Sequence, residues 1–350
     1  MDASAQTIPA LLLGWYDEHQ RSLPWRSAPG MPPPDPYRVW LSEVMLQQTT
    51  TAAVAPYYAK FLARWPDVHA LAAADEGAVM AAWAGLGYYA RARNLIACAK
   101  AVAASGGTFP GTEAELRALP GLGAYTAAAV AAIAFGQRAA VVDANVERVI
   151  TRLYAIDMPL PQARGAIRAR VEALTPAARP GDFAQAMMDL GATICTSRGP
   201  RCLLCPLAAH CAGRARGAEQ FPVKPPKAAK PQRRGHAFWI ADDARVWLER
   251  RPATGMLGAM RALPDDGWTA RADGSAAPPL TGPWTSAGSV RHSFTHFDLD
   301  LQLMVYSGRD CSRLPVKLSA QMGEWWALDR LDEAGLPTLF AKAARLVLAL

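Results

Sequence analysis

The sequence predicts a chain of two differently built domains, an all-α first domain and an α+β second domain. Over residues 8–194, apolar side chains recur every three or four positions in alanine-rich runs that prolines and glycines interrupt, which indicates a series of helices. From residue 236 onward, polar and apolar residues alternate in short runs, which indicates strands. Residues 213–235 are basic and rich in proline, the composition of an extended linker. We therefore predict a domain over residues 1–212, this linker, and a second domain over residues 236–350.

The composition excludes several classes of protein. No signal-peptide pattern opens the sequence and no apolar run is long enough to span a bilayer, so we expect a soluble, intracellular protein with no membrane partner. Six cysteines in such a chain are expected to be metal ligands or buried thiols, and Cys98, which shares a helical face with apolar neighbours, is expected to be a buried thiol. The net charge is +7, but the linker alone carries seven basic residues against one acidic residue. Composition therefore supports DNA binding only weakly.

The helices of the first domain follow from apolar periodicity. The predicted helices cover residues 8–20, 52–65, 70–83, 88–104, 162–174 and 182–194. Another begins near Asp35 and Pro36, because aspartate caps helices and proline suits their first turn. On this helix Glu43 stands at the edge of the apolar stripe and is expected to be half inside. A glutamate in such a place is ordinarily a solvated flank residue.

Residues 119–123 are predicted to form a tight turn. Pro120, Gly121 and Gly123 cannot continue a helix, so the bare backbone N–H groups of the turn should face outward just before the next helix begins. The N–H groups of such a turn can bind an anion.

A buried helix and a carboxylate follow this turn. Residues 125–135 are almost all alanine, valine and isoleucine, which suits a helix packed on several sides. Asp143 stands immediately before a further helical run, residues 144–154. It can be an N-cap that accepts backbone N–H bonds, or a functional carboxylate that leads into a cleft. This stretch alone leaves both interpretations open.

Four ordered motifs resemble a known family. LPGLGAYTA resembles the helix-hairpin-helix of the base-excision DNA glycosylases related to endonuclease III, and VVDANVERV is similar to the segment that follows it there. LPWR with DPYRVWLSEVMLQQTT, and GLGYYARARNL, narrow the resemblance to the MutY-type adenine DNA glycosylases. The resemblance covers nearly all of residues 8–212 and continues more weakly to the C-terminus. It implies an all-α helix-hairpin-helix glycosylase domain.

The resemblance implies roles for the turn and for the carboxylate after it. Leu119, Gly121 and Gly123 belong to the hairpin whose amides hold a DNA phosphate. Asp143 matches the catalytic aspartate, and Asn145 would orient Asp143 or the phosphate.

Two further catalytic candidates come from the same comparison of motifs. Glu43 matches the catalytic acid and base, and a place beside apolar residues suits that task because partial desolvation raises the pKa of a carboxyl. Tyr125 stands at the hairpin position where the bifunctional relatives carry a lysine that forms a Schiff base with the sugar. Tyrosine cannot do so, and we include Tyr125 among the catalytic candidates.

Other residues match contacts to the DNA. Gln48 matches the residue that enters the duplex where the adenine leaves, and Tyr88 one that wedges beside the opposite base. Trp25 and Arg26 match residues that line the adenine pocket. Tyr88 and the adjacent Tyr89 could alternatively be ordinary core residues. We expect a core position for Tyr89 rather than for Tyr88.

Four cysteines form a candidate metal site. Cys195, Cys202, Cys205 and Cys211 are spaced C-x6-C-x2-C-x5-C, a set that can hold zinc or an iron–sulfur cluster. Zinc sites usually show two close pairs and only one is present here, which favours [4Fe–4S]. The spacing resembles the cluster loop of endonuclease III and of its MutY relatives. We expect the cluster to fix a loop. The arginines at positions 198 and 201 are either aimed at phosphates or are solvated charges of the loop.

The second domain is predicted to be α+β. Strands are expected over residues 236–241 and 245–251, forming a hairpin, and over residues 298–305, with closing helices at 329–334 and 337–350. The pattern resembles the Nudix-like C-terminal domain of MutY enzymes. The glutamate-dense box of Nudix hydrolases is missing, so we predict no nucleotide hydrolysis there.

Phe294, Thr295 and His296 resemble the loop with which the C-terminal domain of the family recognises 8-oxoguanine. Serine is the usual middle residue of this loop, and threonine keeps the hydroxyl. The alternative is that Phe294 is a core residue at the start of a strand.

Together these observations predict a monofunctional DNA glycosylase that hydrolyses the N-glycosidic bond of adenine opposite 8-oxoguanine or guanine in duplex DNA. It would extrude the adenine, with Glu43 protonating N7 and Asp143 stabilising the sugar cation. We expect a monomer of bacterial type in the cytoplasm, associated with the nucleoid. The alternatives are an endonuclease III-like glycosylase and lyase acting on oxidised pyrimidines, a non-catalytic DNA-binding protein, and a nucleotide hydrolase.

Overall fold

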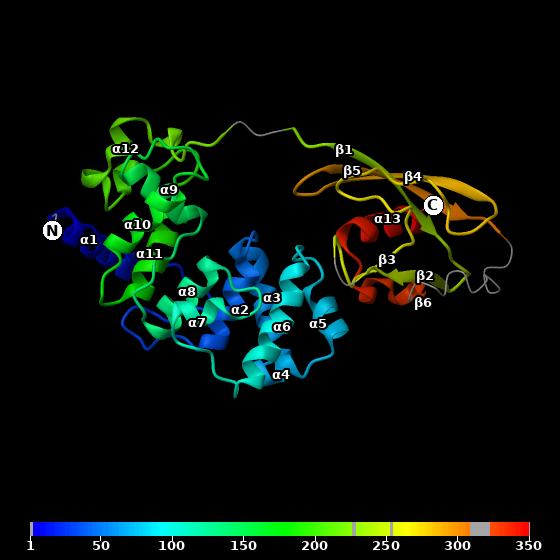
Figure 1. Cartoon of the computed structure of the whole chain (residues 1–350), viewed down its shortest axis with the longest axis horizontal. Helices are drawn as coiled ribbons and strands as arrows, with labels where there is room; N and C mark the ends of the chain where they lie inside the picture. Colours follow the sequence, from blue (N-terminus) through cyan, green and yellow to red (C-terminus); the bar gives the residue numbers. More distant parts are fainter. Residues whose placement is uncertain (1–2, 226–228, 253–254, 309–322, 350) are drawn as a thin grey trace. The chain divides into compact units, whose positions relative to one another are not determined.

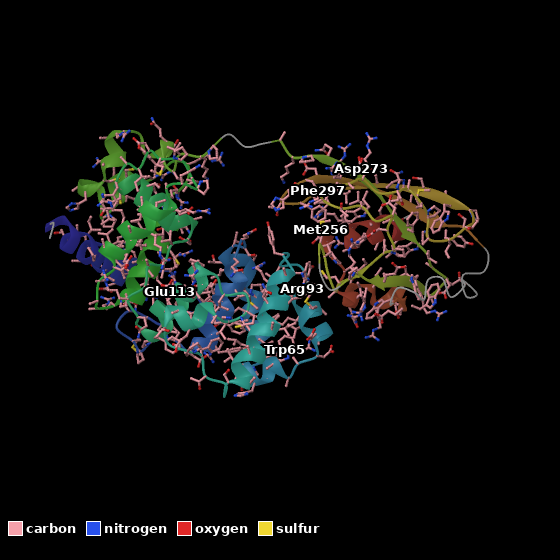
Figure 2. The ribbon with its side chains drawn as sticks, viewed as in Figure 1. Trp65, Arg93, Glu113, Met256, Asp273 and Phe297 are labelled. Atoms are coloured by element: carbon pink, nitrogen blue, oxygen red, sulfur yellow. The ribbon has the colours of Figure 1, made fainter. Side chains whose placement is uncertain are left out.

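The computed structural model of the chain describes residues 3–225, 229–252, 255–308 and 323–349. Residues 226–228 of the predicted linker and residue 350 of the predicted last helix lie outside these ranges. The chain divides into two compact units: residues 1–73 with 94–227 form unit 1, and residues 74–93 with 228–350 form unit 2. Each has a core of its own, with Trp65 buried in unit 1 and Phe297 buried in unit 2 (Figure 2).

The first part of the chain is helical, as predicted (Figure 1). In chain order the helices are α1 (Ala3–His19), α2 (Pro36–Leu46), α3 (Thr51–Arg64), α4 (Val68–Ala72), α5 (Glu76–Trp83), α6 (Ala90–Ala104), α7 (Glu113–Arg117), α8 (Ala124–Phe135), α9 (Ala144–Leu153), α10 (Arg164–Leu174), α11 (Pro180–Thr193) and α12 (Ala212–Ala215). Short 3-10 turns cover Cys202–Leu204, Ala208–His210 and Ala218–Gln220. Within the described part of the chain, no helix has both the length and the apolar character needed to cross a membrane.

Helix α8 is the centre of unit 1. Its residues from Thr126 to Ile133 are all buried, and α2, α7 and α11 pack against it. Short alanine side chains let these neighbours approach closely on several sides, as the composition predicts. The N-cap residue Gly123 makes no side-chain cap, so the hairpin leaves backbone N–H groups at this helix end open. The helix ends at Gly136, which is left-handed with φ 64°.

Two details of the helical part differ from the prediction. The single helix expected over residues 70–83 is two helices, because Asp75 accepts a hydrogen bond from Ala78 N at 2.8 Å and so caps a new helix, α5. Helix α7 was not expected. Its first turn is capped by Thr112, whose hydroxyl accepts from Glu115 N at 3.3 Å and lies 2.6 Å from the Glu115 carboxylate.

Unit 2 contains two three-stranded sheets. One has the order β1 (Gln232–Trp239), β5 (Asp298–Tyr306), β4 (Trp284–Ser293), and the other has the order β3 (Arg261–Ala262), β2 (Arg245–Arg250), β6 (Gly323–Ala327). Strands β1 and β5 are parallel, with Gln232 opposite Asp298, and the other pairs are antiparallel. A 3-10 segment, Leu328–Ala334, and helix α13 (Thr338–Leu348) follow. Apolar residues of both sheets and of α13 form one core.

The predicted hairpin of the second domain is present at its turn but not along its strands. Ala241 and Val246 form an antiparallel bridge, and Asp242 N donates to the carbonyl of Arg245 at 2.8 Å. Beyond this turn, β1 and β2 belong to different sheets. The parallel partner of β1 is β5, whose Leu299, Leu301 and Leu303 are buried in the shared core. The turn signal therefore predicted the connection between the two strands, but it did not reveal which strand pairs with β1 along its length.

The predicted linker also differs from the structure at both ends. Its first residues form α12 and a 3-10 turn, and Phe221 is buried in unit 1. Gly213 packs so closely on α9 that a Cβ there would lie 2.4 Å from the carbonyl oxygen of Arg152. Leu160 N donates to the carbonyl of Val223 at 2.9 Å. At the other end β1 begins already at Gln232, so the extended segment is shorter than its proline content suggests.

Candidate active site

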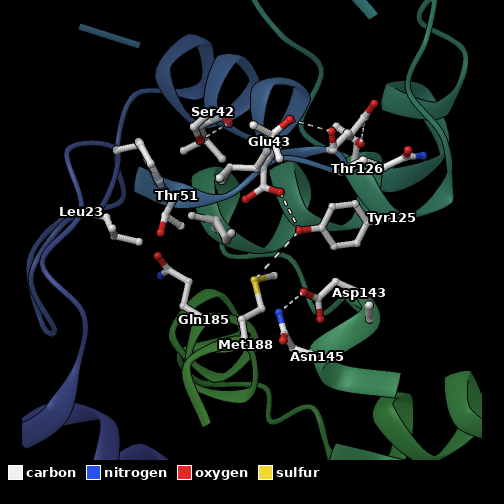
Figure 3. A pocket seen from close by; sticks show the side chains of 18 of the residues that line it. Leu23, Ser42, Glu43, Thr51, Tyr125, Thr126, Asp143, Asn145, Gln185 and Met188 are labelled. Carbon is white, nitrogen blue, oxygen red and sulfur yellow. Dashed lines mark hydrogen bonds between the residues drawn. The ribbon is translucent and has the colours of Figure 1, made fainter. Parts of the chain in front are cut away.

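A cleft of about 970 Å³ lies in unit 1. Its walls come from the loop before α2, from α2 itself, from the hairpin, and from the start of α9 and one face of α11 (Figure 3). Nine of the predicted site residues line it: Trp25, Arg26, Glu43, Gln48, Gly121, Gly123, Tyr125, Asp143 and Asn145. The fold therefore gathers residues from five separate segments of the sequence around one space.

Glu43 lies deeper than the sequence predicts. It is only 5% exposed because α8 covers this face of α2, so the expectation of a half-buried flank residue is wrong. Burial raises the pKa of the Glu43 carboxyl from 4.5 to about 7, and the nearby Asp143 carboxylate raises it further. A hydrogen bond from Tyr125 and the positive charge of Arg26 act in the opposite direction. Near neutral pH this carboxyl is therefore protonated in part of the molecules, and the protonated form can give its proton to a bound group.

Tyr125 is the direct partner of Glu43. Its hydroxyl donates to Glu43 Oε2 at 2.7 Å, and the sulfur of Met188 lies 4.0 Å from the Tyr125 hydroxyl oxygen (Figure 3). Burial, with the charges of Glu43 and Asp143, raises the pKa of the Tyr125 phenol well above its usual value. The phenol therefore keeps its proton and acts as a donor that holds the glutamate in one orientation.

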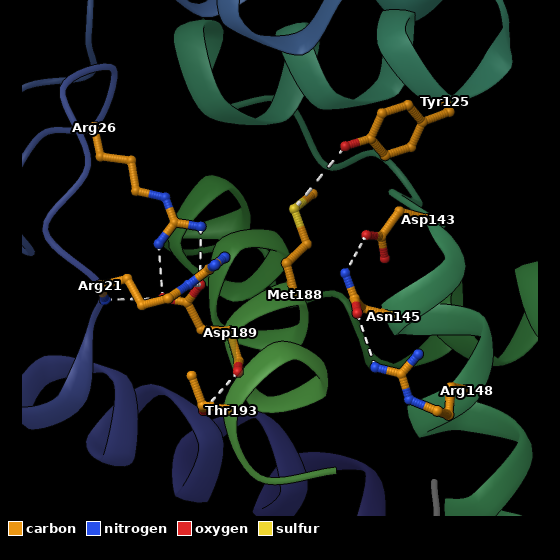
Figure 4. Close-up of polar contacts among 9 residues, drawn as sticks. All are labelled: Arg21, Arg26, Tyr125, Asp143, Asn145, Arg148, Met188, Asp189 and Thr193. Atoms are coloured by element: carbon orange, nitrogen blue, oxygen red, sulfur yellow. Dashed lines mark hydrogen bonds and ion pairs between the residues drawn. The ribbon is translucent and has the colours of Figure 1, made fainter. Parts of the chain in front are cut away.

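Asp143 is an N-cap and also lines the cleft. Its Oδ1 accepts from Val146 N at 2.7 Å, which caps α9. Its Oδ2 accepts from Asn145 Nδ2 at 2.8 Å, and both residues line the cleft (Figure 4). An N-cap carboxylate is held by the helix that it caps, so capping fixes the aspartate in the wall of the cleft.

Asn145 is itself held in place from behind. Arg148 Nη2 donates to Asn145 Oδ1 at 2.8 Å and to the carbonyl of Gly191 at 2.6 Å, and Arg148 Nε donates to the carbonyl of Cys195 at 2.7 Å. A Cβ at position 191 would lie 2.6 Å from the Asn145 Cβ, so only glycine allows α11 to approach this closely. A chain of hydrogen bonds therefore runs from the cysteine loop to the Asp143 carboxylate.

The hairpin also requires glycine. Gly121 has φ 76°, and a Cβ there would lie 2.5 Å from the Cβ of Asn94. The carbonyl of Leu119 accepts from Leu122 N at 3.3 Å and closes the turn. The predicted tight turn is thus present, with Gly121 and Gly123 on the wall of the cleft.

The two residues predicted to enter the DNA share an unusual backbone. Gln48 has φ 58° and Tyr88 has φ 48°, the left-handed region that non-glycine residues rarely adopt. Tyr88 is about half exposed, whereas Tyr89 is buried, as predicted. Gln48 lines the cleft of unit 1 and Tyr88 belongs to unit 2. Strain of this kind collects at functional sites.

Sequence reasoning missed the buried carboxylate of Asp189. Arg26 Nη1 and Nη2 donate to its two oxygens at 2.7 and 3.0 Å, and Arg21 adds its Nε at 2.5 Å and its backbone N at 3.0 Å (Figure 4). The loop that carries Trp25 is thereby anchored to α11. The available signal was one aspartate within an otherwise apolar helical run, AMMDLGA.

The four cysteines are free thiols, and each is half-buried. Burial raises the pKa of Cys205 to about 11, against a hydrogen bond from the backbone of Leu207, and the other three cysteines add to the rise. The four sulfurs are thus close enough to interact electrostatically. In the described ranges no three His, Cys, Asp or Glu side chains meet around one point as a single metal ion requires. The arginines at positions 198 and 201 are exposed beside this loop.

Arg152, on α9, organises the cysteine loop and was not predicted. Only 1% of it is exposed. Its guanidinium donates to the carbonyls of Cys195 at 3.3 Å, Thr196 at 2.7 Å, Ser197 at 3.2 Å and Phe221 at 3.1 Å. It also lies 3.3 Å from the sulfur of Cys195, while its own carbonyl lies 3.5 Å from the sulfur of Cys211.

The predicted recognition loop is the turn between β4 and β5. Phe294 is half-buried and stacks on Phe297 with ring centroids 4.7 Å apart. Thr295 and His296 are exposed at the tip of the turn. Phe294 therefore packs against the core, whereas Thr295 and His296 form an exposed loop.

Comparison with known proteins now identifies the family. Residues 41–175 match the HhH-GPD superfamily of base excision DNA repair proteins, and residues 236–346 match the NUDIX domain. The human adenine DNA glycosylase is 33% identical to this chain, in an alignment that covers 95% of the chain and 72% of that protein. The chain belongs to the adenine DNA glycosylase family.

Other adenine DNA glycosylases agree with this assignment. The enzyme of Mycobacterium tuberculosis is 42% identical over 66% of the chain and 73% of its own length. The enzyme of Mycolicibacterium smegmatis is 41% identical over 60% of the chain and 70% of its own length. The predicted family, and with it the class of DNA glycosylases, is confirmed.

Solved structures confirm the predicted glycosylase fold. A thermostable thymine-DNA glycosylase has a TM-score of 0.55 and 29% identity, covering 61% of this chain and all of that one. A non-covalent endonuclease III–DNA complex has a TM-score of 0.51 and 23% identity over 61% of this chain and 97% of that one, and shares the fold.

Proposed function

We propose that this chain hydrolyses the N-glycosidic bond of adenine that lies opposite 8-oxoguanine or guanine in duplex DNA. One observation carries the proposal: a buried glutamate with a pKa of about 7 and a second carboxylate line the same cleft. Glycoside hydrolysis needs this division, in which one carboxyl group gives a proton and another stabilises the sugar cation.

The proposed reaction assigns a task to each polar group. The adenine leaves the duplex and enters the cleft, because its glycosidic bond is out of reach inside the helix. Protonated Glu43 donates to adenine N7, and the base departs. The Asp143 carboxylate stabilises the oxocarbenium ion, and ionised Glu43 then takes a proton from the attacking water. Tyr125 holds Glu43 in position and Asn145 holds Asp143.

We propose a monofunctional enzyme. A lyase would need an amine to form a Schiff base with the sugar, and the hairpin carries Tyr125 at that place. The described residues that line the cleft include no lysine. Borohydride treatment during the reaction should therefore trap no covalent adduct with DNA, and the abasic product should remain uncut. Efficient trapping would contradict this proposal and support an endonuclease III-like glycosylase and lyase.

We further propose that the four cysteines hold a [4Fe–4S] cluster. Cys195, Cys202, Cys205 and Cys211 would hold the cluster, because four cysteine thiolates are the ligand set that such a cluster takes. The buried Arg152 guanidinium beside the Cys195 sulfur suits thiolate ligands, since it is a cation that needs negative charge nearby. Bonds from these cysteines to a bound cluster would join the two ends of the loop.

Replacing one cysteine tests the cluster. Cys205→Ser should lower bound iron and acid-labile sulfide together from about four of each per chain. Cys98→Ser, a change of a buried thiol outside the set, should leave both unchanged. Iron that persists without sulfide would contradict the cluster and favour a single metal ion.

We propose that residues 236–350 read the base opposite the adenine, and residues 1–212 carry out excision. Thr295 and His296 support this assignment, because they are exposed polar side chains at one turn. Since one chain supplies the whole cleft, we propose that the enzyme acts as a monomer. As a repair enzyme of bacterial type it would work in the cytoplasm on the nucleoid.

Single-turnover release of adenine tests the function. Duplexes would carry adenine opposite 8-oxoguanine, adenine opposite guanine, or thymine glycol opposite adenine. We expect fast adenine release from the first, slower release from the second and no cleavage of the third. Thr295→Ala with His296→Ala should slow the first substrate toward the second, by about tenfold for two lost hydrogen bonds. Cleavage of thymine glycol with strand scission would overturn the proposal.

The hydrogen bond from Tyr125 predicts a shift in pH dependence. Glu43 is protonated below its pKa, so excision should fall as pH rises through about 7. The phenol stabilises the charged form of Glu43 and so lowers its pKa, and Tyr125→Phe should therefore move the midpoint upward by about one unit. Single-turnover rates measured against pH check this. Tyr37→Phe, which removes a hydroxyl bonded to the carbonyl of Trp65, should leave the midpoint unchanged.

A further inference from the structure

Asp189 carries a buried negative charge that the proposed reaction does not use. Its side chain has no exposed surface, and four hydrogen bonds from Arg21 and Arg26 compensate for its lost hydration. The Arg26 pair is bidentate, the geometry that holds a guanidinium in one orientation. This arrangement costs a great deal of desolvation and so suggests a task beyond joining two segments.

Arg26 shares the cleft with Glu43. It lines the same wall, its side chain is only 6% exposed, and its charge is near enough to lower the pKa of Glu43. Both of its terminal nitrogens are nevertheless occupied by Asp189 (Figure 4). A buried arginine and a buried carboxyl in one cleft would otherwise attract each other, because an ion pair is the cheapest way to bury both charges.

We propose that Asp189 is a positioning residue that holds the Arg26 guanidinium against α11 and thereby prevents it from pairing with Glu43. The inference rests on the proposed role of Glu43 as the acid. A guanidinium in contact with a carboxyl favours the ionised form and removes the proton that the reaction needs. The Asp189–Arg26 pair therefore keeps the cleft in its proton-donating state.

The groups around both carboxyls are consistent with this role. Glu43 is faced by Tyr125 from α8, by Asp143 at the start of α9 and by Arg26 from the loop before α2. Asp189 is faced by the two arginines and by Tyr16 of α1, whose pKa burial raises to about 12. Tyr16 is thus neutral near pH 7. Among the groups named in this paragraph, Asp189 is the one that forms an ion pair with Arg26.

The test compares pH profiles of single-turnover adenine release. In Asp189→Asn the freed Arg26 should pair with Glu43, so the midpoint near 7 should move downward by about one unit, and excision above the wild-type midpoint should fall about tenfold. In the double variant with Arg26→Met, the midpoint should return to the wild-type value or rise above it, since the guanidinium is gone. A purely structural role would lower rate or stability in both variants and leave the midpoint in place.

Controls separate this inference from the proposed function. Asp182→Asn removes another carboxylate of α11, one that pairs with Arg179 at 2.8 Å, and should not move the midpoint. If Asp189→Asn fails to fold, adding Arg21→Met removes one of the two uncompensated cations and should give the same downward shift. An unchanged midpoint in the folded variant overturns the inference alone. Full activity of Glu43→Gln would instead overturn the proposed function.

Discussion

Glu43→Gln should abolish adenine release, with the single-turnover rate falling by about a thousandfold or more. The amide cannot give a proton to adenine N7 or take one from water, and a positioned acid and base contributes about 10²- to 10⁴-fold to each such step. Glutamine keeps the length of glutamate, and its carbonyl can still accept the 2.7 Å hydrogen bond from Tyr125. Release from the duplex with adenine opposite 8-oxoguanine, measured with enzyme in excess, checks the loss.

The same variant should be more stable than the wild type at alkaline pH. The pKa of Glu43 rises from 4.5 to about 7 on folding, so the folded chain binds the proton more tightly than the unfolded chain. The free energy of unfolding therefore falls as pH rises from about 4.5 to 7, and remains low above that. One unit of pKa shift corresponds to about 1.4 kcal/mol. The wild type should therefore lose roughly 3 kcal/mol of unfolding free energy at alkaline pH, whereas the glutamine variant should not.

Thermal unfolding measured against pH tests whether the free energy of unfolding falls as predicted. The melting temperature of Glu43→Gln should exceed that of the wild type at pH 8, and the two should converge toward pH 4.5. An inactive variant that is also more stable cannot owe its inactivity to misfolding. A variant that is less stable at alkaline pH, or that excises adenine at the wild-type rate, would contradict the assignment of Glu43 as a buried acid.

Arg152→Met should have the second large effect, a loss of about 3 to 5 kcal/mol in the free energy of unfolding. Methionine fills part of the volume but donates nothing, so the carbonyls of residues 195, 196, 197 and 221 lose a shared donor. Because the same side chain reaches the Cys195 sulfur, bound iron should fall as well. Chemical denaturation and iron analysis measure the two effects separately.

Arg216→Met provides the matched control. Arg216 follows the cysteine loop in the sequence, donates to the carbonyl of Ala155 at 3.3 Å and lies over the ring of Phe221, but its side chain is 54% exposed. Exposed contacts of this kind contribute about 0 to 1 kcal/mol. If both variants lost the same small amount, the buried hydrogen bonds of Arg152 would not hold the loop, and its order would have to come from the cluster alone.

Local signals in the sequence predicted the elements that carry the chemistry. Asp35 and Asp143 cap α2 and α9 as expected, and the glycines of the hairpin precede a buried helix. Each of these signals involves residues a few positions apart, so the sequence displays it directly. The positions of Glu43 and Asp143 in one cleft followed only from the resemblance.

What the sequence did not show depends on distant partners. Arg26 and Asp189 are 163 positions apart, and nothing in the periodicity of either segment selects the other. The depth of Glu43 depends on α8 covering α2, which a stripe on one helix cannot reveal. The parallel pairing of β1 with β5 was missed for the same reason. A turn signal between neighbouring strands does not predict pairing with a strand about 60 residues further along the sequence.

The left-handed backbone at Gln48 and Tyr88 has an evolutionary consequence. Glycine adopts these angles without the penalty that a side chain incurs, so a change to glycine at either codon relieves strain that the present residues bear. Stabilising substitutions of this kind are commonly available to natural proteins. If Gln48 and Tyr88 enter the DNA as the resemblance implies, selection for repair acts at these two positions against selection for folding.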